Sequence, residues 1–247
     1  MKKTLTRGMA VVLLGVLGLA GANLVVAGTA GAATPPQSVH RAPVAFTNHA
    51  LFLQTDNPDG NQIVAYDQAS DGTLSSAGTY DTGGNGGVSA GSAVDPLASQ
   101  GSLRLADGGR ILLAVNAGSN TVSLFRVSGD RLALWQIIPS GGLFPTSIAV
   151  NQGIVYVLNA GGAGSVQGFV ITAGTLRPLP GSNRSLGLAN TDPPNFLQSP
   201  GQVGFSPDGS HVIVTTKQSG PGLDVFSVGF AGLLSLHPAQ DASATPA

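Results

Sequence analysis

The sequence has no cysteine and no glutamate, and lysine is almost absent. Without cysteine the chain cannot form disulfides, ligate metals through thiolates or use a thiol nucleophile. Glutamate and lysine usually fill exposed helical faces, and Lys217 is the single lysine after position 3, so long helices are disfavoured. The 36 Gly, 16 Pro and frequent Val, Leu and Thr are instead typical of strands joined by tight turns.

The start of the chain has the pattern of a secretory signal peptide. Basic residues precede an apolar run over residues 9–27, and small residues follow as far as Ala32, where cleavage is expected. The protein is therefore predicted to be secreted and extracellular, with no membrane contact after cleavage. The predicted organisation is a signal peptide at 1–32, an unstructured leader at 33–48 and one domain at 49–247.

The charge balance argues against a nucleic-acid partner. Three of the 11 Lys and Arg residues lie in the signal peptide, which leaves 8 basic residues against 12 Asp. Binding to nucleic acid requires a basic face, and these few arginines are scattered. No nucleic-acid partner is expected.

One segment is repeated along the chain. LLAVNAGSNTVSLFRVSGDRL at 112–132 is loosely repeated as VYVLNAGGAGSVQGFVITAGTL at 155–176, and the pattern occurs once more on either side. Its aromatic positions lie 44 to 59 residues apart, near the length of a four-stranded propeller blade. These aromatic positions are Tyr66, Phe125, Phe169 and Phe226, followed by the aligned leucines Leu74, Leu132, Leu176 and Leu233.

Turn signals divide each repeat into strands. In the second repeat we expect strands at 102–106, 110–115, 121–127 and 132–139, called a to d, separated by Gly- and Asp-rich turns. Runs such as ILLAV are apolar throughout, which suits strands covered on both faces. The pattern predicts an all-β propeller of about four blades, and a β-sandwich of short strands is the alternative. The expected blades span about 49–82, 99–142, 144–180 and 199–240.

The repeat motifs carry a family resemblance. AVNAGSNTVSLFRV, YVLNAGGAGSVQGF and SPGQVGFSPDG resemble the YVTN-type repeats of the bacterial propeller lactonase family, the 6-phosphogluconolactonase-like proteins, from about His49 to Ser235. The resemblance implies a seven-bladed propeller, of which this chain supplies an incomplete arc, and an activity on lactones. The chain is then a fragment or truncated product, or two chains self-associate through the open blade faces.

Extra chain length falls on one face of the predicted propeller. The longest irregular stretches, 83–99 and 181–198, both connect a strand d to the next strand a, and the b–c loops lie on the same face. Loops on a rigid scaffold commonly carry binding sites. A hydrolase would need a carboxylate to activate water and a cation or amide donors for the oxyanion. The candidates are Asp192 and Lys217 for catalysis, and Asn116, Asn159, Arg184, Asp81 and Asp95 for ligand binding.

Other patterns favour structural interpretations. Asn116 and Asn159 also suit loops that need a polar side chain beside a tight reversal, and the loop carboxylates suit a solvated surface. Gly87-Val88-Ser89-Ala90-Gly91 matches G-x-S-x-G, but its flanks do not predict the strand and helix that this nucleophile motif requires. The four histidines are scattered, so neither a metal site nor a cofactor is expected. Asn183-Arg184-Ser185 matches a glycosylation sequon and is taken as chance.

Two functions stay open. The first is an exported, non-catalytic propeller whose loop face binds a small molecule or an extracellular protein. The second is a hydrolase that opens a lactone of a sugar acid, as the resemblance implies.

Overall fold

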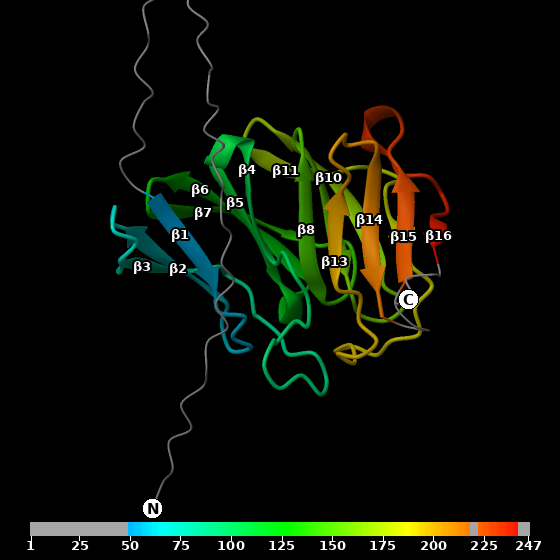
Figure 1. The fold of residues 1–247 in the computed structure, drawn as a ribbon, viewed down its shortest axis with the longest axis horizontal. Coiled ribbons are helices and arrows are strands. Elements are labelled where there is room, and N and C mark those ends of the chain that lie inside the picture. Colours follow the sequence, from blue (N-terminus) through cyan, green and yellow to red (C-terminus); the bar gives the residue numbers. More distant parts are fainter. Residues whose placement is uncertain (1–48, 218–221, 242–247) are drawn as a thin grey trace, which may run out of the picture.

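The computed structural model describes residues 49–217 and 222–241, which form sixteen strands and three short 3-10 helices without an α-helix (Figure 1). Every pair of neighbouring strands within the sheets is antiparallel. The predicted all-β class is confirmed. The predicted signal peptide and leader lie outside the described residues. Among those described, no helix has the length and apolarity needed to span a bilayer.

The strands form four separate sheets, and each is built around one predicted repeat. The third sheet also includes a short strand, Arg184–Ser185, from the connection at 181–198 that was expected to be irregular. The first sheet contains β1 (His49–Gln54), β2 (Gln62–Gln68) and β3 (Leu74–Asp81). The second contains β4 (Leu103–Ala106), β5 (Ile111–Asn116), β6 (Thr121–Ser128) and β7 (Arg131–Pro139).

The third sheet contains β8 (Pro145–Asn151), β9 (Ile154–Asn159), β10 (Ser165–Thr172), β11 (Thr175–Pro178) and the short β12 (Arg184–Ser185). The fourth contains β13 (Gln202–Phe205), β14 (His211–Thr216), β15 (Gly222–Ser227) and β16 (Ala239–Asp241). The 3-10 helices are η1 (Asp107–Gly109), η2 (Ala117–Ser119) and η3 (Phe230–Gly232).

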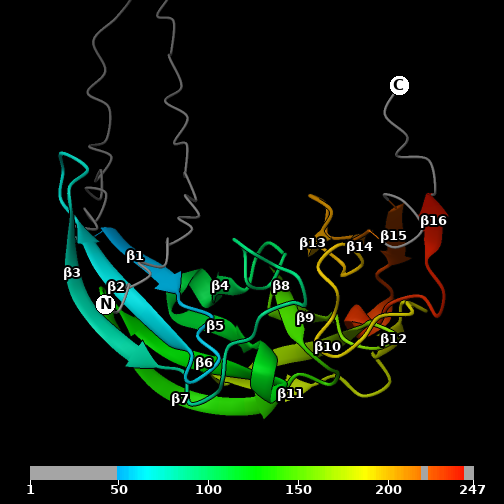
Figure 2. The ribbon, with the colours of Figure 1, turned by 90° about the horizontal axis from the view of Figure 1, so that it is seen from below.

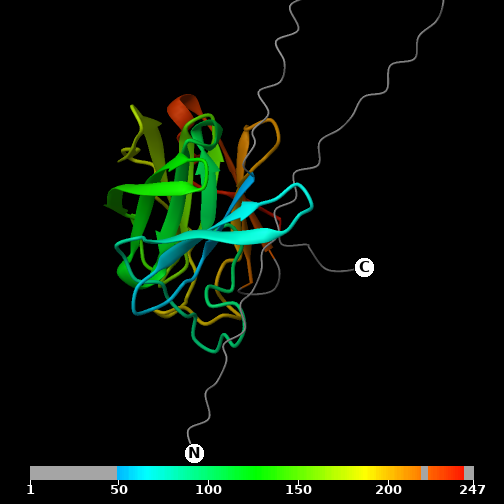
Figure 3. The ribbon, with the colours of Figure 1, turned by 90° about the vertical axis from the view of Figure 1, so that its left-hand side faces the viewer.

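The sheets follow one another along an arc, as the propeller interpretation requires (Figure 2). Three apolar clusters fill the spaces between consecutive sheets. A view from the side of the first sheet shows β1–β3 in front of the other three sheets (Figure 3). The core is thus a series of interfaces between blades rather than one central mass.

The four aromatic residues of the repeat occupy equivalent positions. Each is the fifth residue of its strand, in β2, β6, β10 and β15. Phe125, Phe169 and Phe226 are fully buried, and each belongs to the cluster that joins its sheet to the preceding one. Tyr66 is only partly buried, because no sheet of the described residues precedes the first.

Burial patterns separate the interior sheets from the terminal ones. All six residues of β5 are buried, whereas burial alternates along β2 and along β14. A strand covered on both faces can be apolar throughout, and a strand covered on one face buries only every second side chain. The apolar runs in the second and third repeats therefore reflect their interior position.

One predicted equivalence is wrong by a residue. The repeat alignment placed Leu233 with Leu132 and Leu176, but in the fourth sheet Leu234 is the buried leucine and pairs with Val228. The turn η3, in which Ala231 has a φ of 56°, adds one residue between strands. The outer strand of this sheet, β16, begins at Ala239.

Candidate functional site

The two long insertions lie on one side of the arc, at the bottom of Figure 1. They contact each other directly. Ala90 and Asn195 form a parallel bridge, the Ala90 amide donates to the Pro194 carbonyl at 2.8 Å, and the Phe196 amide donates to the Ala90 carbonyl at 3.1 Å. Residues 83–99 and 181–198 are therefore one joined structure that links the first half of the arc to the second.

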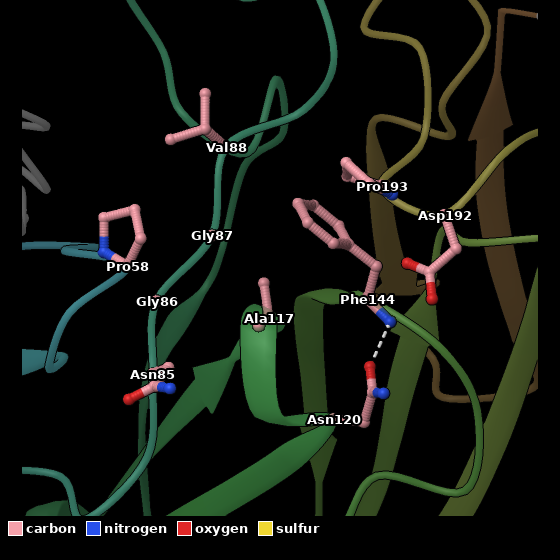
Figure 4. A pocket seen from close by; sticks show the side chains of 11 residues that line it. Pro58, Asn85, Gly86, Gly87, Val88, Ala117, Asn120, Phe144, Asp192 and Pro193 are labelled. Carbon is pink, nitrogen blue, oxygen red and sulfur yellow. Dashed lines mark hydrogen bonds between the residues drawn. The ribbon is translucent and has the colours of Figure 1, made fainter.

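A cavity of about 340 Å³ lies between these insertions (Figure 4). One wall is formed by the first insertion and the β1–β2 loop, and the facing wall by Phe144 and the second insertion. The short helix η2 and Asn120 lie at its base. The lining residues are Pro58, Asn85, Gly86, Gly87, Val88, Ala117, Gly118, Asn120, Phe144, Asp192 and Pro193.

Phe144 is held in an unusual conformation at this cavity. Its φ is 54°, in the left-handed region that bulky residues rarely enter. The Phe144 amide donates to Asn120 Oδ1 at 2.6 Å, and a Cβ atom at Gly87 would lie only 2.9 Å from the Phe144 ring. Backbone conformations of this kind persist where the surroundings impose them, and they cluster at binding sites.

The cavity also has acidic and donor groups. Asp192 is exposed, with its carboxylate beside Phe144 in Figure 4. Across from it, the amides of Gly87 and Val88 have no acceptor among the described residues. A carboxylate accepts hydrogen bonds and a free amide donates one. The facing walls of the cavity thus present one acceptor group and two donor groups.

Of the two catalytic candidates, only Asp192 lines the cavity. Lys217 instead binds both insertions: its Nζ donates to the carbonyls of Ala98 and Phe196 at 2.9 Å each and to Ser199 Oγ at 3.4 Å. Burial lowers the pKa of Lys217, and the nearby Asp95 carboxylate opposes this shift. The structure does not bring Asp192 and Lys217 together in the cavity, so the predicted pair is not assembled.

Asn116 and Asn159 are fully buried at the ends of β5 and β9. Asn116 Nδ2 donates to Thr121 Oγ1 and Ser123 Oγ, and its Oδ1 accepts from Asn61. A Cβ atom at Gly84 would lie 2.6 Å from Asn116 Cγ, and one at Gly142 would lie 2.6 Å from Asn159 Cγ. Each asparagine thus packs under a crossing between sheets, away from the cavity surface.

The other ligand-binding candidates also lie outside the cavity lining. Arg184 is buried and donates to the carbonyls of Gly181, Asn183, Leu234 and Ser235, so its guanidinium holds the second insertion to the fourth sheet. Asp81 is exposed and accepts from Gln62. Asp95 accepts from the amides of Leu97 and Ser99 within its own loop.

Asp56, in the β1–β2 loop, is an acidic group that the sequence interpretation missed. Burial raises the pKa of Asp56 to about 6, a hydrogen bond from Gln54 opposes the shift, and the Asp95 charge adds to it. Its backbone packs directly against Gly86 in the cavity wall. No local pattern marks Asp56, because its burial comes from the insertion that folds over it.

The remaining motifs do not form a site in the described part of the chain. Ser89 is fully buried and is flanked by irregular chain, so the structure lacks the strand and helix of a nucleophile elbow. His211 begins β14 at the opposite end of the sheet from the insertions. No group of three or more His, Cys, Asp or Glu among the described residues could hold a metal ion.

Comparison with known proteins relates this geometry to solved propellers. No protein-family model and no curated protein matches the sequence. Structural matches include a functionally unknown protein from Desulfotomaculum acetoxidans (17% identity, TM-score 0.53) and proposed 6-phosphogluconolactonases from Bacteroides fragilis (17%, 0.52) and Bacteroides uniformis (14%, 0.52). This chain has a lactonase-like propeller fold.

The matches cover 80%, 76% and 75% of this chain, and 59%, 56% and 56% of the matched chains. The chain thus spans a little over half the length of these structures. The resemblance that the repeat motifs carry is confirmed at the level of the fold. At these identities the likeness does not extend to activity.

Proposed function

We propose that this protein is exported and binds a small polyhydroxylated ligand, such as a sugar acid or its lactone, in the cavity between the two insertions. One observation carries the proposal: the exposed Asp192 carboxylate and the unpaired amides of Gly87 and Val88 line the same cavity, beside the Phe144 ring. The pattern of residues 1–32 supports export.

The chemistry of the walls defines the ligand class. A carboxylate accepts from ligand hydroxyls, and amide donors bind carbonyl or hydroxyl oxygens. Phe144 is almost fully buried, so it gives the cavity an apolar wall rather than a free ring face. The cavity volume of about 340 Å³ is at the lower end for small-molecule sites. A single sugar ring therefore suits it better than an oligosaccharide.

Hydrolysis of a lactone in the same cavity is the second candidate. In this reaction, Asp192 would accept a proton from water, and the resulting hydroxide would attack the lactone carbonyl. The Gly87 and Val88 amides would stabilise the oxyanion. The ring oxygen would then leave with the proton that Asp192 had accepted, which gives the open hydroxy acid and restores the Asp192 carboxylate. The likeness to proposed 6-phosphogluconolactonases favours this class of ligand.

Calorimetric titration with a panel of sugar acids and their lactones tests the binding proposal, while loss of lactone in the same mixtures tests turnover. We expect binding by the unmodified protein and binding at least about tenfold weaker in Asp192→Asn, because a hydrogen bond to a charged group is lost. Asp59→Asn, which removes an exposed carboxylate outside the cavity lining, is the matched control and should bind normally.

Binding without turnover supports the binding function alone, and turnover lost in Asp192→Asn supports the hydrolase. If no member of the panel binds or reacts, or if Asp192→Asn and Asp59→Asn bind equally well, the proposed site is wrong.

A further inference from the structure

A second cavity, of about 270 Å³, opens between the second and third sheets. It lies at the end of the sheets opposite the insertions, where the β4–β5 turn approaches the β10–β11 turn. Its lining residues are Asp107, Arg110, Ile111, Arg126, Val127 and Gly174. Nothing in the proposed function uses this end of the molecule.

The side chain of Arg126 is exposed and stacks on an aromatic ring, and its N–H groups bind no acceptor among the described residues. Its guanidinium carbon lies 3.3 Å from the centroid of the Trp135 ring, which is a close cation–π contact. Among the described residues Arg126 has no carboxylate partner and no side-chain hydrogen bond. A guanidinium has five N–H donors, so all five are available to a ligand.

An irregularity in the backbone of β7 brings Trp135 into contact with Arg126. Leu124 pairs with Gln136 and Phe125 with Leu134, so Trp135 is the extra residue of a β-bulge in β7. Bulges redirect a side chain out of the regular alternation of a strand. Trp135 remains 50% exposed, although it is the only tryptophan of the chain.

The charge of the cavity is positive overall. Arg110 donates to both carboxylate oxygens of Asp107, at 2.7 Å through Nη2 and 3.1 Å through Nε, so the one acidic group in the lining is already neutralised. The Arg126 charge is left uncompensated. Stacking on Trp135 also means that little side-chain freedom is lost when an anion binds.

We propose that this cavity binds a small oxyanion, a carboxylate or phosphate group, through the guanidinium of Arg126 stacked on Trp135. Arginine binds both groups through two parallel hydrogen bonds. The volume admits a small anion rather than a folded partner. The site is independent of the cavity between the insertions.

The single tryptophan provides a direct readout. Inorganic phosphate and acetate are titrated separately into the full chain at constant ionic strength set with sodium chloride, while tryptophan fluorescence is recorded. Equilibrium dialysis with radiolabelled phosphate or acetate measures binding without relying on a fluorescence change. We expect saturable binding of at least one anion. The anion that binds shows whether the cavity accepts a phosphate group or a carboxylate group.

Two variants distinguish specific binding by the cavity from a general effect of positively charged side chains on anion binding. Arg126→Gln should weaken binding at least about tenfold, because charge-assisted hydrogen bonds are lost. Arg131→Gln removes the same charge from β7 outside the cavity lining and should bind normally. Each variant is compared with its own anion-free spectrum, and thermal unfolding verifies that it is folded.

Three results would overturn the proposal: no retention of either anion in dialysis by the unmodified protein, equal binding by Arg126→Gln, or equal weakening by Arg131→Gln. Failure of the sugar-acid panel would leave this test unaffected, since that panel concerns the other end of the sheets.

Discussion

Ala90 pairs with Asn195, and this parallel bridge joins two insertions that belong to different crossings of the propeller. The bridge places Gly87 and Asp192 on facing walls of one cavity. Since both segments lack regular secondary structure of their own over most of their length, their mutual contacts and the ammonium of Lys217 hold them in position.

Replacing Lys217 by Met should loosen the joined insertions. Its ammonium donates to acceptors in both segments, and loss of charged hydrogen bonds at a partly buried site costs about 1–3 kcal/mol. Hydrogen exchange at the Ala90 and Phe196 amides should become faster, whereas strand amides of β9 should not change. Arg177→Met, which removes an exposed cation on β11, is the control, and similar acceleration in that variant would contradict the assignment.

Phe169→Ala should destabilise the protein by about 3–5 kcal/mol, because it creates a cavity between the second and third sheets. Tyr66→Ala should cost less than about half as much, since the equivalent ring in the first sheet is only partly buried. Denaturant unfolding of the two variants measures both free energies. A loss below about 1 kcal/mol for Phe169→Ala, or equal losses for both, would be incompatible with this arrangement of blades.

Asp56 should make stability depend on pH. Burial raises the pKa of Asp56 from 3.8 to about 6, so the folded state binds this proton more tightly than the unfolded chain. Its contribution is therefore most favourable below about pH 4, and it is lost as the pH rises through about 6. In Asp56→Asn, the melting temperature relative to the unmodified protein should increase between pH 4 and pH 7. Asp59→Asn in the same loop is the control, and a constant difference across this range would exclude the effect.

Local patterns in the sequence predicted much of the fold. The four strands of the second sheet begin and end within one residue of the expected bounds, because turn signals and apolar runs mark them. Counting strands along each repeat also predicted that both insertions lie on the same face, because each connects a strand d to the next strand a. Leu233 was misplaced because η3 adds a residue in a turn whose length the repeat alone does not determine.

The site was less predictable because it depends on contacts between distant segments. Asp192 was expected on the loop face and does line the cavity, but the free amides of Gly87 and Val88 become relevant only when the two insertions pair. Lys217 and Arg184 were selected as cations near these loops. In the structure both side chains donate hydrogen bonds to backbone carbonyls of the protein itself. No sequence pattern identifies these acceptors.

The glycines at the crossings have a wider consequence. Gly84 and Gly142 each sit over a buried asparagine with no room for a methyl group, so the chain enters the second and the third sheet through the same tight polar joint. The angular step between neighbouring blades is then set at this joint and in the apolar interface beneath it. The first insertion follows this joint at Gly84, so its outer residues can lengthen or change in sequence without altering the angle between the first and second sheets.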